Sequence, residues 1–407
     1  MCANKMRPFR HTITLTEALE IIIGNARPVT KTELVQLARA NGRVLARDVQ
    51  SSVDVPPFDR AAMDGYALIS EDAGNASPDN PCVLQSIETV HTGNTPTQKI
   101  QPGTCTEIAT GAPIPDGADA VIMVEHTEQS SHGSVKILAA VKPQQNIGQR
   151  GADIKIHEVI LKQGDRLTPS RLGAIAALGI KEVEVFVRPV VTIFSTGNEI
   201  VPPGQPLRTG QIYDINRFTL GAVIEEHGGQ VKHQPTSIDT LESLTASINA
   251  CADSDIFVLS GGSSVGERDL TVDAIKQLGT VLFHGVAVKP GKPTVFGRIG
   301  DSPVFGMPGY PTSCLSNAYM LLVPLLRRRA RLPEHKARVI SATLSKTVFS
   351  TRGRHQFYPV KVVEGEAIPA FRASGNITSM SKADGFIEIA SETETLEKGS
   401  IVDVTFF

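Results

Sequence analysis

The chain contains little cysteine, and its cysteines form no recognisable pattern. Five of its 407 residues are cysteines, and no two of them make a CxxC pair. An odd, widely spread set argues against a disulfide framework and against a zinc site built from thiolates. This composition favours a reducing compartment, and we expect the protein to be cytoplasmic.

Long apolar runs and a dominant charge are also absent. The longest apolar stretches, such as residues 320–326, fall well short of the roughly 20 residues that a membrane-spanning helix needs. Residues 1–10 are polar and basic with no apolar segment after them, so we expect neither a secretory signal nor a membrane partner. The formal net charge is −2, and this near balance indicates no nucleic-acid partner.

Two common catalytic patterns are missing as well. The chain has ten histidines, but no HExxH or comparable spacing, which argues against a metal site built from histidine. There is no G-x-S-x-G elbow, and the neighbours Ser263 and Ser264 have no obvious histidine partner. Acyl-transfer chemistry is therefore disfavoured.

The hydrophobic pattern changes along the chain, whose length indicates several domains. Apolar residues at intervals of three and four predict amphipathic helices over 16–27 and 32–46. Short β-like runs separated by proline and glycine then predict a β-rich insert domain over 51–147. The pattern is helical again over 159–180, so we expect residues 1–50 and 148–182 to form one discontinuous N-terminal domain.

The central segment alternates between strand and helix patterns. Strands are expected at 189–194, 256–259, 281–288 and 303–306, and helices at 216–227, 239–252 and 312–329. This alternation predicts a parallel sheet with helices on both faces, a three-layer α/β domain over residues 183–331. A second β-like region predicts a separate C-terminal barrel or sandwich over 332–407.

Polar loops follow the predicted strands of the central segment, where ligands bind in such sheets. In the loop 261–269, glycines can bring backbone N–H groups close to a phosphate. A carboxylate there, Asp269, usually needs a cation such as Mg²⁺ beside phosphates. Lys289 and Lys292 can neutralise an oxyanion. Together these loops predict nucleotide or phosphoester chemistry.

Two aspartates have structural interpretations of their own. For Asp239 taken alone, a helix N-cap is the better interpretation, since apolar residues follow at helical spacing. Asp64 lies in a dense cluster at 56–67, and composition does not decide between a buried domain junction and a functional carboxylate.

Eight ordered motifs carry a resemblance to a known family. They are PPFDRAAMDGYA (56–67), TGAPIPDGADAV (110–121), RGADI (150–154), STGNE (195–199), GQIYDIN (210–216), GGSSVGERD (261–269), KPGKP (289–293) and GMPGYP (306–311). With them the chain closely resembles the molybdopterin molybdenumtransferase family, known as MoeA in bacteria and as the E domain of gephyrin in animals.

The resemblance implies a fold, a reaction and partners. It implies a homodimer of four-domain subunits, with a central domain similar to the molybdopterin adenylyltransferase fold and an active site shared between subunits. The implied substrates are adenylylated molybdopterin and molybdate, or tungstate, and AMP is released in a step that depends on Mg²⁺. Transient contacts with molybdopterin adenylyltransferase and with apo-molybdoenzymes are implied as well. A scaffold module and an adenylyltransferase are the alternative interpretations.

The resemblance also implies roles for particular residues. Asp269, Glu199 and Asp239 hold the Mg²⁺ ion and orient water, and Lys289 and Lys292 stabilise charge. Asp64 and Asp153 complete the acidic set from the other subunit. The expected substrate-binding residues are Gly261, Gly262, Ser263, Ser264, Gly266, Pro290, Gly291, Gly309, Arg354 and Ser379.

Two positions depart from the family pattern. Many members read GLPGNP where this chain has Tyr310, and TGDE where it has Asn198. The second change removes a negative charge, which weakens position 198 as a metal ligand.

Overall fold

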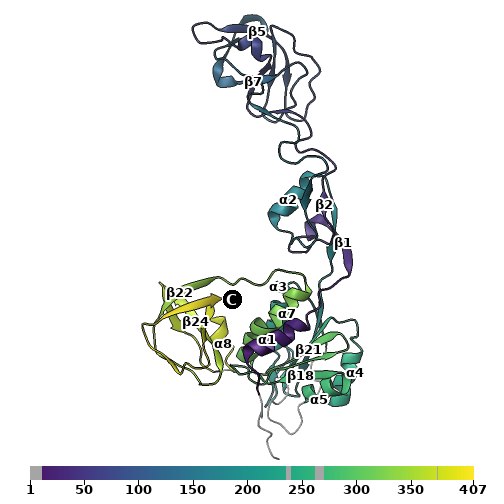
Figure 1. The fold of residues 1–407 in the computed structure, drawn as a ribbon, viewed down its shortest axis with the longest axis vertical. Coiled ribbons are helices and arrows are strands. Elements are labelled where there is room, and N and C mark those ends of the chain that lie inside the picture. Colours follow the sequence, from purple (N-terminus) through teal and green to yellow (C-terminus); the bar gives the residue numbers. More distant parts are fainter. Residues whose placement is uncertain (1–11, 235–239, 262–269, 374) are drawn as a thin grey trace, which may run out of the picture. The chain divides into compact units, whose positions relative to one another are not determined.

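A computed structural model describes residues 12–234, 240–261, 270–373 and 375–407. The chain divides into two compact units (Figure 1). The first unit comprises Met1–Glu33, Gly42–Val44 and Val185–Phe407, and the second comprises Leu34–Asn41 and Leu45–Glu184. The four domain boundaries expected from the sequence remain predictions.

A six-stranded sheet forms the centre of the first unit. Its order is β16 (Gln230–His233), β13 (Val190–Thr196), β17 (Ile256–Gly261), β21 (Ser302–Met307), β20 (Val295–Ile299) and β18 (Thr280–His284). The first four strands are parallel neighbours, as predicted, but β20 is antiparallel to both β21 and β18. The prediction missed β20 and was wrong here, because a tight turn joins β20 to β21 and such a turn can connect only antiparallel strands.

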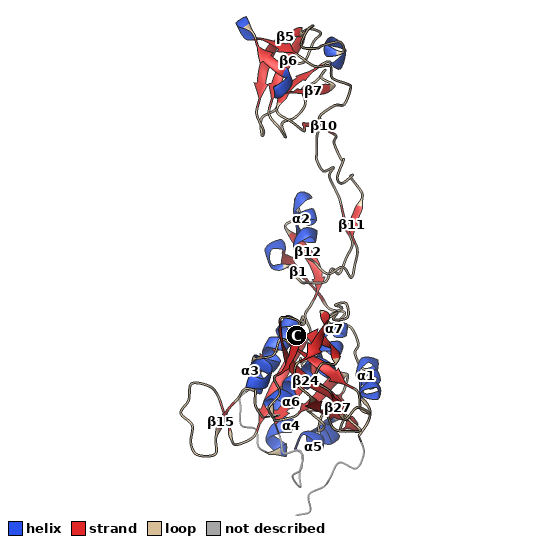
Figure 2. Cartoon of the chain, turned by 90° about the vertical axis from the view of Figure 1, so that its left-hand side faces the viewer, coloured by secondary structure: helices blue, strands red, loops and turns tan. Residues whose placement is uncertain are grey.

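Helices cover both faces of this sheet, which confirms the three-layer α/β architecture (Figure 2). One face carries α1 (Leu15–Gly24), α3 (Asn216–Glu226), α6 (Pro311–Asn317), the π-helical turn η5 (Ala318–Leu322) and α7 (Val323–Arg329). The other face carries α4 (Leu241–Asn249) and α5 (Leu270–Leu278). Because side chains alternate along a strand, Ile193 of β13 faces the first layer and Phe194 the second.

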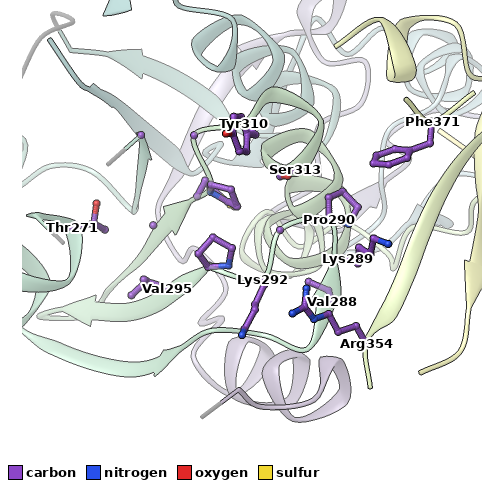
Figure 3. Close-up of a pocket in the computed structure, with 17 residues that line it drawn as sticks. Thr271, Val288, Lys289, Pro290, Lys292, Val295, Tyr310, Ser313, Arg354 and Phe371 are labelled. Atoms are coloured by element: carbon purple, nitrogen blue, oxygen red, sulfur yellow. The ribbon is translucent and has the colours of Figure 1, made fainter. Parts of the chain in front are cut away.

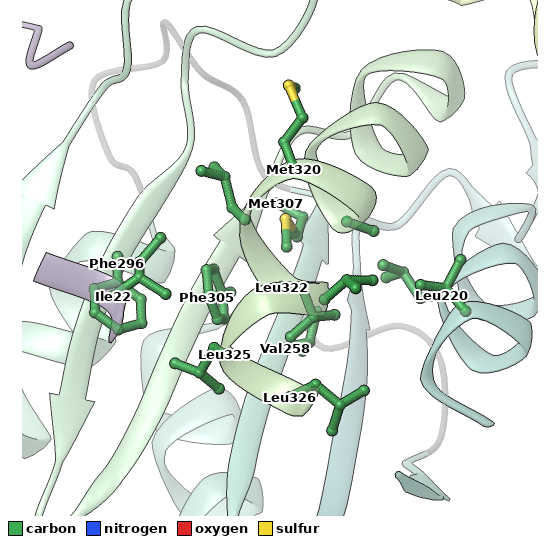
Figure 4. Close-up of a cluster of buried hydrophobic side chains, with 14 of the residues drawn as sticks. Ile22, Leu220, Val258, Phe296, Phe305, Met307, Met320, Leu322, Leu325 and Leu326 are labelled. Carbon is green, nitrogen blue, oxygen red and sulfur yellow. The ribbon is translucent and has the colours of Figure 1, made fainter. Parts of the chain in front are cut away.

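The larger apolar cluster of this unit gathers the helices of the first layer on the sheet (Figure 4). Ile22 of α1 is fully buried in it, as are Leu325 and Leu326 of α7. Phe296 and Phe305, on neighbouring strands, pack with ring centroids 4.8 Å apart. Helix α1 therefore contributes to the core of the first unit.

The C-terminal part of the first unit is a closed five-stranded barrel, which confirms the predicted β domain. The strands are β24 (His355–Val363), β25 (Glu366–Pro369), β22 (Val339–Leu344), β28 (Ile401–Phe406) and β26 (Gly385–Ile389), and β26 pairs back with β24. A short strand, β19 (Val288–Lys289), adds to β24 in parallel. The small elements of this unit are β14 (Ile200–Val201), β15 (Ile212–Tyr213), β23 (Val348–Phe349), β27 (Thr395–Leu396) and α8 (Thr378–Ser381).

The second unit contains the expected β-rich insert. Its sheet has the order β7 (Ala120–Met123), β4 (Gly65–Leu68), β6 (Thr104–Ile108), β5 (Cys82–Val90), β9 (Ser134–Ile137) and β8 (Thr127–Gln129). Two short pairs follow, β3 (Arg60–Ala61) with β10 (Ile147–Gly148) and β2 (Val49–Gln50) with β11 (Val159–Leu161). The short helical turns are η1 (Leu37–Arg39), η2 (Ser70–Ala73), η3 (Val124–His126) and η4 (Ser131–Gly133).

The helix predicted over 32–46 was wrong, and the one predicted over 159–180 was confirmed only in part. Residues 32–36 form a strand, β1 (Thr32–Gln36), that pairs with β12 (Glu182–Phe186). The apolar spacing there marks no buried face, since Leu34 is 70% exposed. In 159–180 only α2 (Pro169–Ala177) is a helix. It begins where the Thr168 side chain accepts a hydrogen bond from Arg171 N and Pro169 occupies the first turn.

None of the helices in the described residues is both long enough and apolar enough to cross a membrane.

Candidate functional site

A cavity of about 300 Å³ opens at the carboxyl end of the first unit's sheet (Figure 3). Gly261 ends β17 there, and Met307 ends β21. The 289–293 loop forms a second side, and the barrel contributes Arg354 and Phe371. The cavity thus lies where a sheet of this kind is expected to hold a ligand.

Seven of the residues expected to bind substrate or act in catalysis line this cavity. They are Gly261, Lys289, Pro290, Gly291, Lys292, Gly309 and Arg354. They come from the end of β17, from the 289–293 loop, from the connection between β21 and α6, and from the residue just before β24. Their individual roles remain predictions, but residues far apart in sequence share one cavity.

Buried polar groups fix the backbone between the two lysines. Gly291 has a φ of +100°, and a Cβ at this position would lie 2.3 Å from Nδ2 of Asn317. That amide, fully buried on α6, donates a hydrogen bond of 2.8 Å to the Gly291 carbonyl oxygen. The Thr294 hydroxyl donates a second bond to the same oxygen, at 2.9 Å. Only glycine fits this close approach, so the backbone carrying both lysines is held in one place.

Three cationic side chains gather at the cavity. Lys289 lies in β19, and its Nζ donates to the Thr351 hydroxyl at 2.9 Å. Lys292 follows in the same loop, and Arg354 precedes β24. No carboxylate occurs among the described residues that line the cavity. This part of the site therefore complements an anion such as phosphate or a tetrahedral oxyanion.

Asn216 was not among the predicted site residues, although it connects the ends of β17 and β21 by hydrogen bonds. It is buried at the start of α3, and its Nδ2 donates to Ser260 Oγ at 2.8 Å and to the Gly309 carbonyl oxygen at 2.9 Å. Gly261, which follows Ser260 in β17, has a φ of +113°, and a Cβ there would lie 2.1 Å from the Thr196 carbonyl oxygen. The only signal for Asn216 was its place at the end of the GQIYDIN motif.

Other lining residues were also missed. Ser313 of α6 and Thr271 of α5 contribute hydroxyls, and Tyr310 and Phe371 contribute aromatic rings. Tyr310 was noted only as a departure from the family pattern. Nothing in the spacing of Phe371 or Thr271 in the sequence indicated this cavity.

Two expected residues do not line the cavity. Glu199 is exposed in the loop after β13, where its carboxylate folds over Gly197, since a Cβ on that glycine would lie 2.6 Å from Glu199 Oε2. Ser379 is buried, and its Oγ accepts a hydrogen bond of 3.0 Å from Arg372 N. In the structure Ser379 thus holds the segment next to Phe371.

Six expected site residues lie outside the described residues, namely Asp239, Gly262, Ser263, Ser264, Gly266 and Asp269. The Mg²⁺ site assigned to Asp269, Glu199 and Asp239 therefore stays a prediction. Within the described part of the chain, no group of three or more His, Cys, Asp or Glu residues could hold a metal ion. Glu199, the described member of the set, offers the carboxylate oxygens that Mg²⁺ prefers.

In the second unit, Asp64 lies exposed in the turn before β4. Its Oδ1 accepts hydrogen bonds from Thr110, at 2.6 Å from the backbone N and at 2.9 Å from the hydroxyl. The backbone bond, and then the hydroxyl bond, lower the pKa of Asp64 below its ordinary value of 3.8. The buried-junction interpretation is wrong, although a backbone bond does hold the carboxylate.

Asp153, the other expected carboxylate of the second unit, is exposed as well. Its backbone N donates to the Val55 carbonyl oxygen at 2.9 Å, which fixes the position of its main chain. Both carboxylates are therefore available at the surface of this unit.

Comparison with known families covers most of the chain in three consecutive parts. Residues 13–179 match the MoeA N-terminal region (domain I and II), and residues 192–328 match a probable molybdopterin binding domain. Residues 341–407 match the MoeA C-terminal region (domain IV). The second match contains the sheet and most of the cavity described above.

Individual relatives agree along nearly their whole length. A molybdopterin molybdenumtransferase of Haemophilus influenzae is 34% identical over 405 residues, which cover 97% of this chain and 98% of the relative. A solved structure of a molybdopterin biosynthesis MoeA protein from Pyrococcus horikoshii is 42% identical, covers 97% of this chain and 99% of its own, and gives a TM-score of 0.83. Since the three regions follow in the family's order and such relatives match from end to end, this chain belongs to the MoeA family.

Proposed function

We propose that the protein is a molybdopterin molybdenumtransferase, which inserts molybdenum from molybdate into adenylylated molybdopterin and releases AMP. The observation that carries this proposal is the set of Lys289, Lys292 and Arg354 at one cavity, most of which lies in the segment that matches a probable molybdopterin binding domain. The name of the Haemophilus influenzae relative supports the same reaction.

The cationic side chains have a direct use in this reaction. Molybdate is a tetrahedral dianion, and the phosphoanhydride of the second substrate carries several negative oxygens. Fixed cations that meet these oxygens bind the substrates and stabilise the charge that develops on the phosphate as its link is cleaved. The clamped backbone at Gly291 places Lys292 without much further loss of conformational entropy on binding.

A test of the reaction uses purified protein with adenylylated molybdopterin, molybdate and Mg²⁺. We expect AMP release, and we expect the product to activate an apo-molybdoenzyme. A protein that released no AMP and gave no activating product would contradict the proposal. Offering tungstate in competition with molybdate in the same assay measures which of the two oxyanions the cavity prefers.

The divalent ion is a further part of the proposal. Asp269, Glu199 and Asp239 would hold Mg²⁺, and the ion would neutralise phosphate charge when bound. The carboxylate of Glu199 supports this, because hard cations take oxygen ligands. Removing divalent ions with a chelator is expected to abolish AMP release, and adding Mg²⁺ back is expected to restore it. Full activity in the chelator would contradict this part.

We also propose a homodimer in which Asp64 and Asp153 of one copy complete the site of the other. The resemblance supports this, as does the exposure of both carboxylates. Asp64→Asn and Lys292→Ala chains can be co-expressed with different tags and the mixed dimer isolated. A shared site predicts one intact site per mixed dimer, and therefore about half of the wild-type activity. An inactive mixed dimer would show that both residues must come from the same copy.

The cellular setting completes the proposal. We propose that the protein works in the cytoplasm and exchanges material with molybdopterin adenylyltransferase and apo-molybdoenzymes. The thiols of Cys82, Cys105, Cys251 and Cys314 are free in the structure, which suits a reducing compartment. Fractionation of cells, followed by co-purification with each candidate partner, tests these statements, and recovery of the protein outside the cytoplasm would contradict the first.

A further inference from the structure

The cavity is lined by side chains of two chemical kinds. Lys289, Lys292 and Arg354 contribute cations, and Tyr310 and Phe371 contribute aromatic rings (Figure 3). We propose that the two rings form an aromatic wall that receives the flat heteroaromatic ring of a ligand whose phosphate lies at the cations. This inference rests on the proposed function and assigns one part of the substrate to named residues.

Tyr310 is placed for such a contact. It stands between Gly309 and α6, and its carbonyl oxygen accepts a hydrogen bond of 2.9 Å from Cys314 N, which fixes its main chain at the start of the helix. Gly375 borders one side of its ring, since a Cβ added at that glycine would lie 3.6 Å from Tyr310 Cδ1. The residue is nevertheless 66% exposed and lines the cavity. The ring therefore offers open aromatic surface to the cavity.

Phe371 reaches the cavity from the barrel. It is half-buried and packs on Tyr358, with ring centroids 5.5 Å apart and planes at 55°. The Thr312 hydroxyl of α6 donates to the Asn376 carbonyl oxygen at 3.0 Å. That bond connects α6, which follows Tyr310, with Asn376, which follows Phe371 in the C-terminal part of the chain.

The two kinds of side chain together select a class of ligand. A cationic site alone accepts many small anions, whereas stacking on an aromatic side chain needs a flat ring and tolerates different bases. A phosphate ester of a flat nitrogen heterocycle offers its phosphate to the cations and its ring to the aromatic side chains. Adenylylated molybdopterin contains two such groups, adenine and pterin.

The experiment compares three probes by isothermal titration calorimetry. AMP carries adenine and phosphate, neopterin monophosphate carries pterin and phosphate, and ribose 5-phosphate carries no ring of this kind. For Tyr310→Ala we expect about tenfold weaker binding of AMP, of neopterin monophosphate or of both, equivalent to about 1.4 kcal/mol. Ribose 5-phosphate should bind equally to wild type and variant. The probe that responds identifies the heterocycle at the wall.

Matched variants complete the design. Tyr310→Phe keeps the ring and should bind every probe within about twofold of wild type, while Lys292→Ala should weaken all three. Equal binding of both heterocyclic probes to wild type and Tyr310→Ala would overturn the inference, as would an equal loss for ribose 5-phosphate. Thermal unfolding of each variant checks that the fold is retained, which the exposure of Tyr310 leads us to expect.

The molybdenum transfer assay on wild-type protein separates this inference from the proposed function. If the heterocyclic probes need the Tyr310 ring to bind but the protein has no transfer activity, the proposed function is overturned and the aromatic wall stands. Transfer activity with binding that ignores Tyr310 would overturn the wall alone.

Discussion

The two units of the chain fix their charged side chains by different means. In the first unit, buried amide and hydroxyl groups from Asn317 and Thr294 clamp the backbone at Gly291, on either side of which the lysines stand. In the second unit, two hydrogen bonds from Thr110 hold the carboxylate of Asp64 itself. At Gly291 the bonds position the main chain, and at Asp64 they position the charged group itself.

The chemistry of the charges explains this difference. Lysine and arginine remain protonated at neutral pH without help, so the fold need only bring their main chains to the right place. A carboxylate in an exposed turn can rotate freely, and donors that bond to its ionised form both orient it and keep it ionised. The comparison therefore predicts different responses to mutation and to pH in the two units.

The largest loss of activity is expected when one charged side chain is removed, either at the cavity of the first unit or at Asp64 of the second unit. Lys292→Ala and Asp64→Asn are each expected to lower the rate of molybdenum transfer about 100- to 1,000-fold, the size typical of losing one group that stabilises transition-state charge. AMP release under saturating substrate measures this. The exposed residues Lys398 and Asp79 provide controls, as Lys398→Ala and Asp79→Asn, which should retain full activity. If only one of the two site variants lost activity, the other residue would have no part in the reaction.

Hydrophobic periodicity predicted much of what positions the cavity. The alternation of strands and helices in the central segment indicated the fold class, and the rule that ligands bind at strand ends selected Gly261 and the 289–293 loop, whereas Gly309 came from the family resemblance. These residues do share a cavity. Such patterns succeed because they record which face of an element is buried.

Contacts between distant elements could not be predicted in this way. Asn317 and Asn216 appear in the sequence as ordinary helix residues, and their partners at Gly291 and Gly309 lie 26 and 93 positions away. Only the packed structure shows which loop a buried amide reaches. The segment 32–46 fails for a related reason, because the pairing of β1 with β12 outweighs a weak helical spacing.

The next largest effect is expected at acidic pH, which should destabilise the first unit more than the second. His227 in the first unit is 2% exposed and lies 3.2 Å from Arg327, measured from Nδ1 to Nη1. Burial, followed by the charges of Arg327 and His335, lowers the pKa of His227 from 6.5 to about 4. The described histidines of the second unit, His91, His126, His132 and His157, are all exposed.

The sign of the effect follows from proton binding. Below pH 6.5, His227 binds a proton in the unfolded chain but stays neutral in the folded chain. Its contribution to the free energy of unfolding is therefore complete above pH 6.5 and is lost as the pH falls to about 4. The loss should reach roughly 3 kcal/mol. Urea unfolding at pH 7 and pH 4.5, followed by hydrogen exchange in each unit, should show the first unit weakening more. In His227→Gln this extra loss should shrink, and an unchanged loss would assign the acid sensitivity to other groups.

Substituting Gly291 tests the clamp with a smaller expected effect. Gly291→Ala adds a Cβ beside the Asn317 amide, whereas Gly300→Ala adds one in open space at another position with positive φ. Both should lose about 1 kcal/mol from backbone strain. Gly291→Ala should lose a further 1–3 kcal/mol, roughly the cost of overpacking. Urea midpoints measure the stability, and calorimetry with AMP should show weaker binding only for Gly291→Ala. Equal results for the two variants would mean that the clamp does not hold the loop.

The smallest effect is expected from weakening the hydrogen bonds that hold Asp64 in the second unit. Thr110→Val removes the hydroxyl bond to Asp64 but keeps the backbone N–H bond, which contributes more to lowering the pKa of Asp64. The pKa should therefore rise only part of the way to its ordinary value, and Thr110→Ser should leave it unchanged. Carbon-detected NMR of labelled aspartate between pH 2 and pH 6 follows the carboxyl directly. An unchanged pKa of Asp64 in Thr110→Val would show that the backbone N–H of Thr110 alone holds this carboxylate. The hydroxyl of Thr110 would then play no part in the difference between the two units.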